Sequence, residues 1–362
     1  MAYTTIDDPG KHFNVIGYTG DLQDDRPMPG VGFQPDLVWF KNRNTTNDHE
    51  LYDSSRGVTK KIKTNNEAAE GDSSTRVKSF DSDGLTISTD PSANGGGNLM
   101  LAYNWKANGG TTTSFTESGN NPGGTYQANT TAGFSIVTYT GTGGEGTVSH
   151  GLGVAPNLIL IKARTEPTGG THFGSDQGNW IVYHHKTATD PETDCLLLNT
   201  TGALVDSTGH MNDTAPTSSV FNINTNVDVN EDADTYLAYC FAEKQGYSKF
   251  GNFVGNGNTH GPFIYTGFKP AYLIIKCTSA VKDWLLIDNV LHPTNTASVL
   301  RLKANDTNAT DNSADNCIDF LSNGFKVRST SSSFNADGET WVYIAFAENP
   351  FVTSNGTPGS AR

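Results

Sequence analysis

The sequence predicts an all-β protein built from three tandem β-sandwich domains. Its apolar segments are short, rich in β-branched and aromatic residues, and bounded by Gly, Pro and Asn, as in "DLVWFK" at 36 and "FSIVTY" at 134. Such segments, separated by closely spaced turn residues, are typical of strands in sandwiches and barrels. A long segment also recurs three times along the 362 residues, so we expect the same β unit three times.

The repeat is clearest where a glycine turn leads into an apolar strand. The segments "YTGDLQDDRPMPGVGFQPDLVWFK" at 18, "YTGTGGEGTVSHGLGVAPNLILIK" at 139 and "FVGNGNTHGPFIYTGFKPAYLIIK" at 253 align without a gap. Gly gives the backbone the freedom for a turn, and Pro fixes φ at the strand entrance. We expect the final Lys to mark the point where the strand returns to solvent. The motif residues are Gly32, Pro35 and Lys41; Gly153, Pro156 and Lys162; and Gly267, Pro270 and Lys276.

Each copy continues with two further shared segments. The first is "HELYDS" at 49, "NWIVYH" at 179 and "DWLLID" at 283, and the closing segment is "NLMLAYNWKA" at 98, "DTYLAYCFAE" at 234 and "ETWVYIAFAE" at 339. The period is far longer than a solenoid or propeller repeat, so each copy is expected to be a self-contained domain.

The composition between the copies predicts the domain boundaries. A run of Gly, Thr, Ser and Asn with little to bury predicts a flexible connector between copies one and two, and the last residues predict a frayed tail. The expected organisation is copy one at 1–108, a linker at 109–132, copy two at 133–246, copy three at 247–349 and a tail at 350–362.

The apolar runs "LVWF", "LILI" and "YLII" do not alternate with polar residues. A strand with one face in water should alternate, so both faces are expected to be covered. A long loop, a neighbouring copy or another subunit could supply the second cover. The last possibility predicts a homo-oligomer, and we favour a trimer.

The net charge of −14 disfavours nucleic acid and anionic membranes as partners. No apolar run has the length of a membrane span or a signal peptide, so we expect synthesis in a cytoplasm and no membrane insertion. The cysteines lack metal-binding spacing and are expected to be free buried thiols: Cys195, Cys240, Cys277 and Cys317.

No nucleophile, P-loop or zinc motif is present, so the sequence predicts that the protein is not an enzyme. His184 and His185 are adjacent in an expected strand end and would point to opposite faces. No cofactor is expected except possible calcium. Its candidate ligands alternate in "DVNEDAD": Asp228, Asn230, Asp232 and Asp234. The alternative is a solvated polar turn, and the cluster at 305–316 is a looser candidate.

Glycan binding is a second possibility, because lectin-like sandwiches stack sugars on exposed aromatic rings. Trp180 and Trp284 hold matching places in copies two and three, and matched aromatics are more often core residues. Trp105, in the closing segment of copy one, is a third tryptophan that could either stack sugars or lie in the core. The aromatics expected in loops are freer candidates, namely Phe115, Tyr126, Phe173 and Phe334.

Taken together, "YTG", "GFQPDLVWFKNR", "LYDSSRGVTKKI", "SFDSDGLTIS" and "LAYNWKANGG" in copy one resemble a family of repeat proteins of marine tailed bacteriophages, and "VSHGLGVAPNLILIKAR" resembles its second module. The resemblance covers essentially the whole chain. It implies jelly-roll or lectin-like sandwiches in a virion structural protein at the particle surface, made in the host cytoplasm. The implied role is a tail fibre, spike or adhesin that contacts other virion proteins and the host surface. A capsid decoration or head-fibre protein, and a glycan-binding or glycan-cleaving receptor module, are the alternatives.

Overall fold

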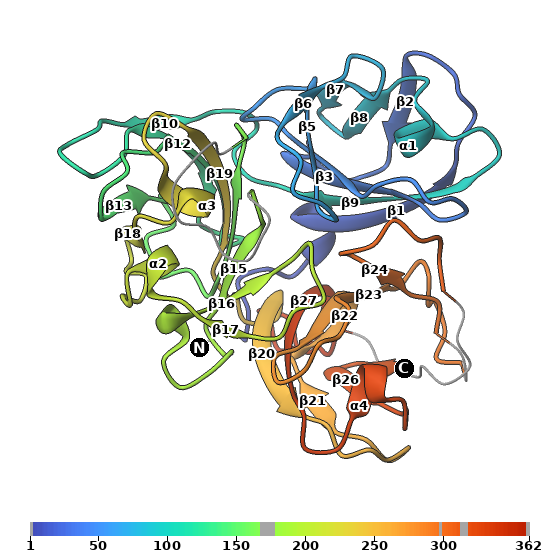
Figure 1. Ribbon diagram of the computed structural model, residues 1–362. Helices are drawn as coiled ribbons and strands as arrows, with labels where there is room; N and C mark the ends of the chain where they lie inside the picture. The colour runs from blue at the N-terminus through green and yellow to red at the C-terminus, as the bar shows by residue number, and fades with distance from the viewer. Residues whose placement is uncertain (1–2, 167–177, 297–298, 312–317, 360–362) are drawn as a thin grey trace.

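The computed structural model describes residues 3–166, 178–296, 299–311 and 318–359. The described chain is predominantly β, with short single-turn helices, so the predicted all-β class is confirmed. Figure 1 shows the larger sheets near the centre of the molecule and the smaller sheets toward its outside. No helix among the described residues is long and apolar enough to cross a membrane.

The first copy forms a six-stranded and a three-stranded sheet. Its large sheet has the order β1 (Phe13–Thr19), β9 (Leu99–Trp105), β3 (Leu37–Asn42), β4 (Glu50–Asp53), β5 (Lys60–Lys63) and β6 (Gly71–Asp72). Its small sheet has the order β2 (Arg26–Pro29), β8 (Gly84–Ile87) and β7 (Val77–Asp81). The helices are η1 (Pro9–Lys11) and α1 (Pro91–Asn94).

The second copy forms an eight-stranded and a two-stranded sheet. The large sheet runs β10 (Thr113–Phe115), β11 (Gly124–Asn129), β12 (Phe134–Thr140), β19 (Thr235–Phe241), β14 (Leu158–Ala163), β15 (Ile181–His184), β16 (Asp194–Leu197) and β17 (Val205–Asp206). The small sheet pairs β13 (Gly146–Ser149) with β18 (Val220–Ile223). The helices are η2 (Pro191–Thr193), α2 (Thr208–Met211) and α3 (Val227–Asn230).

The segment 109–132 differs from the expected flexible linker, because β10 and β11 extend the large sheet of the second copy. The buried Gln127 of β11 fixes the segment: its side-chain oxygen accepts from the N–H groups of Asn108 (3.0 Å) and Gly110 (2.7 Å). Backbone pairing and one satisfied amide therefore order a stretch that has few apolar side chains to bury.

The third copy forms a five-stranded and a three-stranded sheet. The large sheet runs β20 (Ser248–Val254), β27 (Thr340–Pro350), β22 (Phe268–Cys277), β23 (Leu285–Asp288) and β24 (Leu302–Lys303). The small sheet runs β21 (Phe263–Tyr265), β26 (Gly324–Val327) and β25 (Ile318–Leu321), and α4 spans Ser332–Asn335. The motif proline of this copy, Pro270, lies at a register shift between β22 and β27, where a missing N–H costs least.

The motif turns take the same backbone conformation in all three copies. Gly32, Gly153 and Gly267 have φ values of 89°, 72° and 85°. Side chains with a Cβ rarely adopt this left-handed region, so the turn requires glycine. The motif strand then pairs with the closing strand in one shared register, joining Leu37 to Trp105 in copy one and Leu158 to Phe241 in copy two.

Successive side chains of the motif strand enter two different hydrophobic clusters. In β3, Val38 and Phe40 face a cluster shared with the small sheet of the first copy. Leu37 and Trp39 point the other way, into a cluster that joins buried residues of all three copies. Equivalent strands of the other copies do the same. The apolar runs do not alternate because both of their faces are buried.

The shared cluster means that neighbouring copies of the same chain cover the second face of each large sheet. It differs from the expectation that each copy buries its core alone, and it removes the reason for invoking another subunit. The packing leaves a cavity of about 30 Å³ with an apolar lining that includes Trp39, Leu160 and Ile274.

The chain ends join the first and third copies. The hydroxyl of Tyr3 donates to the carbonyl of Gly267 at 2.9 Å, and the carboxylate of Asp7 accepts from the backbone N–H of Ser354 at 2.6 Å. The described part of the expected frayed tail is thus hydrogen-bonded to the fold. Together with the shared cluster, these contacts close the three copies into a ring.

Candidate functional site

The three motif lysines lie at the contacts between copies. Lys41, Lys162 and Lys276 are fully buried, so the expectation that they mark a return to solvent is wrong. The reason is that the strand does not end at the surface: its end is covered by a loop of the neighbouring copy. Each ammonium group donates to a backbone carbonyl of that loop.

These lysine contacts run in one direction around the ring, so that each copy is tied to a different neighbour. The accepting residue lies at the same offset in every loop, two positions after an asparagine. The three contacts are Lys41 Nζ to Thr307 O (2.7 Å), Lys162 Nζ to Glu67 O (2.9 Å) and Lys276 Nζ to Thr201 O (2.9 Å).

A backbone hydrogen bond returns across each of the same contacts. Its donor lies further along the covering loop, and its acceptor lies two residues after the motif lysine. The bonds are Glu70 N to Arg164 O (2.9 Å), Leu204 N to Thr278 O (2.8 Å) and Thr310 N to Arg43 O (2.9 Å). The cyclic arrangement therefore rests on main-chain groups that every copy possesses.

Burial lowers the pKa of Lys41, Lys162 and Lys276 to about 8 in each case. Carbonyl dipoles from two chain segments partly replace the lost hydration of each ammonium group. A lysine with a lowered pKa can act as a nucleophile, but these three side chains are enclosed by protein. Their arrangement serves to hold the copies together.

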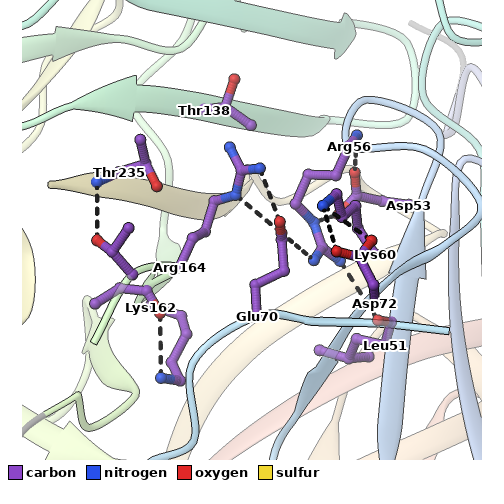
Figure 2. Close-up of polar contacts among 12 residues, drawn as sticks. Leu51, Asp53, Arg56, Lys60, Glu70, Asp72, Thr138, Lys162, Arg164 and Thr235 are labelled. Carbon is purple, nitrogen blue, oxygen red and sulfur yellow. Dashed lines mark hydrogen bonds and ion pairs between the residues drawn. The ribbon is translucent and has the colours of Figure 1, made fainter.

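An ionic cluster reinforces the contact between the first and second copies. Figure 2 shows Glu70 between the guanidinium groups of Arg56 and Arg164, at 2.9 Å from each. Arg56 also pairs with Asp53 at 2.5 Å, and both side chains are fully buried. Burial alone would raise the pKa of Glu70, but the hydrogen bonds from Arg164 and the charge of Arg56 lower it. The two arginines thus stabilise the Glu70 carboxylate in its charged form.

Among the described residues, the other two lysine contacts have no counterpart of Glu70 held between two arginines. Leu204 and Thr310 occupy the offset of Glu70 in the other loops, and Thr278 stands in place of Arg164 in the third copy. The copies therefore share the lysine and backbone contacts but have diverged in the side chains around them.

A tyrosine of the closing strand forms another contact between copies. The hydroxyl of Tyr239 donates to Asp53 of the first copy at 2.8 Å. The hydroxyl of Tyr103 donates in the same way to Asp288 of the third copy, also at 2.8 Å. At the remaining contact Ile344 replaces the tyrosine. There His184 replaces the aspartate and lies 3.1 Å from the carbonyl of Tyr343.

The candidate calcium ligands are used within the protein. Asp228 and Asn230 are buried in the single turn α3, whereas Asp232 is exposed and Asp234 is half-buried. Asp228 accepts from the N–H groups at 178 and 179, at 2.8 and 3.1 Å. The amide of Asn230 bonds to the N–H at 142 and the carbonyl at 144. Within the described ranges, no group of three or more His, Cys, Asp or Glu residues could hold a metal ion.

Asn230 belongs to a repeated structural position that the sequence comparison missed. Asn94 and Asn335 end the equivalent helical turns α1 and α4, and both are fully buried. Each side-chain oxygen accepts from the backbone N–H that follows the opening strand, at 2.9 Å. The available signal was an asparagine a few residues before each closing segment. The varied residues around it concealed the pattern.

The aromatic candidates for glycan binding are mostly core residues. Trp105, Trp180 and Trp284 are buried, and the last two donate their indole N–H to a carbonyl of the neighbouring copy. Phe334 is also fully buried. Phe115 and Tyr126 are half-buried and stack on each other, with ring centroids 6.3 Å apart. Phe173 lies outside the described residues.

Where the structure describes them, the candidate histidines and cysteines provide no exposed reactive group. His184 is buried, and its neighbour His185 lies 2.6 Å from the carbonyl of Phe250. Cys195, Cys240 and Cys277 are buried free thiols, and burial raises the pKa of each. Cys317 lies outside the described residues.

Comparison with known proteins adds one finding. A family model described as a domain of unknown function, DUF7483, matches residues 8–350 and so spans all three copies. No curated protein and no solved structure matches the chain. A single family model thus covers the same three copies that the contacts join into a ring.

Proposed function

The chain belongs to the DUF7483 family, and we propose that it is a structural and adhesive protein on the surface of a tailed-phage particle, placed as a tail fibre or spike. The resemblance of its repeated segments to marine phage proteins supports the virion location. The structural role is supported mainly by where the three motif lysines point. They are buried and hydrogen-bond to neighbouring copies, and none of them lines an open cleft.

We propose further that each copy is a β-sandwich of jelly-roll or lectin-like type. Support comes from the clusters in which side chains of a large sheet meet those of the small sheet of the same copy. Such a ring would act through assembly and contact with other virion proteins and the host surface, not through catalysis. It would be rigid, because each copy is fixed to both of the others.

A homotrimer remains a prediction, but the need to cover the apolar strand faces no longer supports it. The apolar strand faces that called for another subunit are covered by copies of the same chain. Assembly would therefore have to use the outer surfaces of the ring, where the small sheets lie (Figure 1).

Two alternatives remain as second candidates. A capsid decoration or head-fibre protein would use the same rigid ring on the head of the particle. A glycan-binding receptor module is favoured by exposed aromatic residues of the third copy, Phe263 and Tyr265. A glycan-cleaving module would in addition shorten soluble host polysaccharide.

Immunogold electron microscopy of purified phage particles, with antibody against the recombinant protein, tests the proposal. We expect gold on the tail, and gold on the head would favour the decoration alternative. Mass spectrometry of the same particles, against a lysate of uninfected host as control, should recover peptides of this chain. Particles that contain none of these peptides would contradict a virion role.

A further inference from the structure

Two large aromatic side chains are exposed side by side on the third copy. Phe263 is 47% exposed and Tyr265 is 53% exposed, whereas Ile264 between them is buried in the cluster of the third copy. Successive side chains of a strand point to opposite faces, so Phe263 and Tyr265 share the outer face of β21, about 7 Å apart along the strand. This sheet lies at the outside of the ring (Figure 1).

The aromatic pair is specific to the third copy. Ile264 pairs with Phe325, just as Met28 pairs with Leu85 and Val148 with Phe221. These registers place Pro27 and Pro29 at the two outward positions of the first copy, and Thr147 and Ser149 at those of the second. The shared fold therefore does not require aromatic residues here, and their exposure in one copy calls for a separate explanation.

Polar and charged side chains continue this outer face across the sheet. Phe263 pairs with Lys326, and Lys326 pairs in turn with Asp319. Arg328 follows the end of β26, two residues after Lys326. Its guanidinium group forms an ion pair with the carboxylate of Asp319 at 2.9 Å. A row of one aromatic ring, one ammonium group and one carboxylate thus crosses the three strands.

One hollow borders Tyr265, and a second borders Lys326, the cross-strand partner of Phe263. The one beside Tyr265 has a volume of about 340 Å³ and is lined by Tyr3, Glu243, Gln245 and Lys249, among others. The one beside Lys326 has a volume of about 510 Å³ and is lined by Thr259, His260, Lys326, Asp319 and Arg328. The hollow beside Tyr265 presents hydroxyl, amide and charged groups, and the hollow beside Lys326 presents a hydroxyl, an imidazole and charged groups.

We propose that the outer face of β21 and its two flanking hollows form a binding site for an oligosaccharide of the host surface. Phe263 and Tyr265 stack against the apolar faces of sugar rings, and the polar side chains of the hollows hydrogen-bond the hydroxyl groups. Lys326 and Arg328 favour glycans that carry carboxylate groups. The inference rests on the host-contact part of the proposed function and names its ligand class.

The chemistry of this face fits a carbohydrate better than a protein surface. Two neighbouring exposed rings, bordered by hydrogen-bonding groups, match a chain of sugar units with alternating apolar faces and hydroxyl edges. A protein partner would instead favour a continuous apolar patch with a polar rim. Binding requires no change in the ring, because the aromatic side chains already lie in the open.

The test is binding of the purified full chain to an array of bacterial capsular, lipopolysaccharide and exopolysaccharide glycans. The variants Phe263→Thr and Tyr265→Ser exchange the aromatic residues for those of the second copy. Thr147→Ala and Ser149→Ala are matched controls at the equivalent positions. We expect the intact chain to bind acidic glycans, each aromatic variant to lose at least about tenfold in affinity, and the controls to bind unchanged.

Unchanged melting temperatures would show that the aromatic variants still fold, although Tyr265→Ser also removes the 2.8 Å hydrogen bond between the hydroxyls of Tyr265 and Tyr3. A chain that binds no glycan on the array would overturn the inference, as would binding that survives loss of both aromatic residues. If immunogold places the chain on the particle but no glycan binds, the inference fails while the proposed function stands. If the chain binds glycans but is absent from phage particles, the proposed virion role fails while the glycan-binding site stands.

Discussion

His184 and Asp288 hold equivalent positions in the second and third copies, and burial shifts their pKa values in opposite directions. The pKa of His184 is lowered to about 4, and that of Asp288 is raised to about 6. Both effects disfavour a buried charge. Where the first and third copies have a Tyr–Asp contact, the second and third copies have His184 bonded to a main-chain carbonyl. The histidine is uncharged there near neutral pH.

Asp288→Asn should change how stability depends on pH. The folded protein holds the Asp288 proton more tightly than the unfolded chain, whose carboxyl has a pKa of 3.8, so wild-type stability falls as pH rises from about 4 to 6. The variant lacks this loss and should gain about 3 kcal/mol relative to wild type across that window. Urea unfolding at pH 4, 5, 6 and 7 measures the difference. The exposed Asp213→Asn serves as control, and parallel curves for wild type and Asp288→Asn would refute the prediction.

A double-mutant cycle at the divergent contact tests whether the Tyr–Asp pair can be restored. His184→Asp alone should cost about 3 kcal/mol or more, because it leaves a buried carboxylate without a partner. Adding Ile344→Tyr supplies the hydroxyl that Tyr103 and Tyr239 supply elsewhere, so part of the loss should be recovered. We expect a coupling energy of about 1–2 kcal/mol from denaturant unfolding of the two single variants and the double variant. Strictly additive effects would mean that the positions do not form this contact.

Lys162→Met tests the buried lysines through the pH dependence of stability. At pH 7 two effects oppose each other: the carbonyl of Glu67 loses its donor, at a cost of about 1–3 kcal/mol, while the cost of burying a charge disappears. The folded state releases the Lys162 proton at a pKa of about 8 and the unfolded chain at 10.5, so wild-type stability rises through that range. Between pH 8 and 10.5 the free energy of unfolding of the wild type should rise by about 3 kcal/mol relative to that of the variant.

The exposed Lys186→Met provides the matched control for this measurement, because it removes an ammonium group that is already in water. Its stability should follow the wild type at every pH. A Lys162→Met curve that also runs parallel to the wild type would show that the Lys162 ammonium is solvated, against the burial described above.

Part of this architecture could be predicted from the sequence. The strand containing Trp39 and Phe40 was recognisable from its apolar run, and the lack of alternation correctly indicated two buried faces. The sequence left open what covers the second face, because the covering residues belong to other copies of the repeat. Lys41 was misplaced because a lysine is normally exposed, and only the loop around Thr307 supplies the carbonyl that allows its burial.

The ordered segment 109–132 escaped prediction for a related reason. Its Thr, Ser, Asn and Gly residues contribute little apolar surface, and its order comes from backbone pairing with β12 and from Gln127. Neither effect has a signature in composition. The same holds for Asn230, whose neighbours suggested calcium but whose amide completes a main-chain turn.

Asn230→Ala separates these two roles. The N–H of Thr142 and the carbonyl of Gly144 would lose their partner, so stability should fall by about 2 kcal/mol with or without calcium. Asn94→Ala and Asn335→Ala should cost similar amounts. Thermal unfolding in calcium and in chelator measures both effects, and we expect the same melting temperature in each. A calcium-dependent rise that Asp228→Asn abolishes would instead establish a calcium site.

The shared core predicts that the three copies fold as one cooperative unit. Native-state hydrogen exchange, followed by mass spectrometry on the closing strands β9, β19 and β27, tests it most directly. All three strands contribute to the shared cluster, so their slowest amides should exchange through one global opening with a single free energy and a single denaturant dependence. Three separate free energies, one for each copy, would show independent domains and contradict the claim.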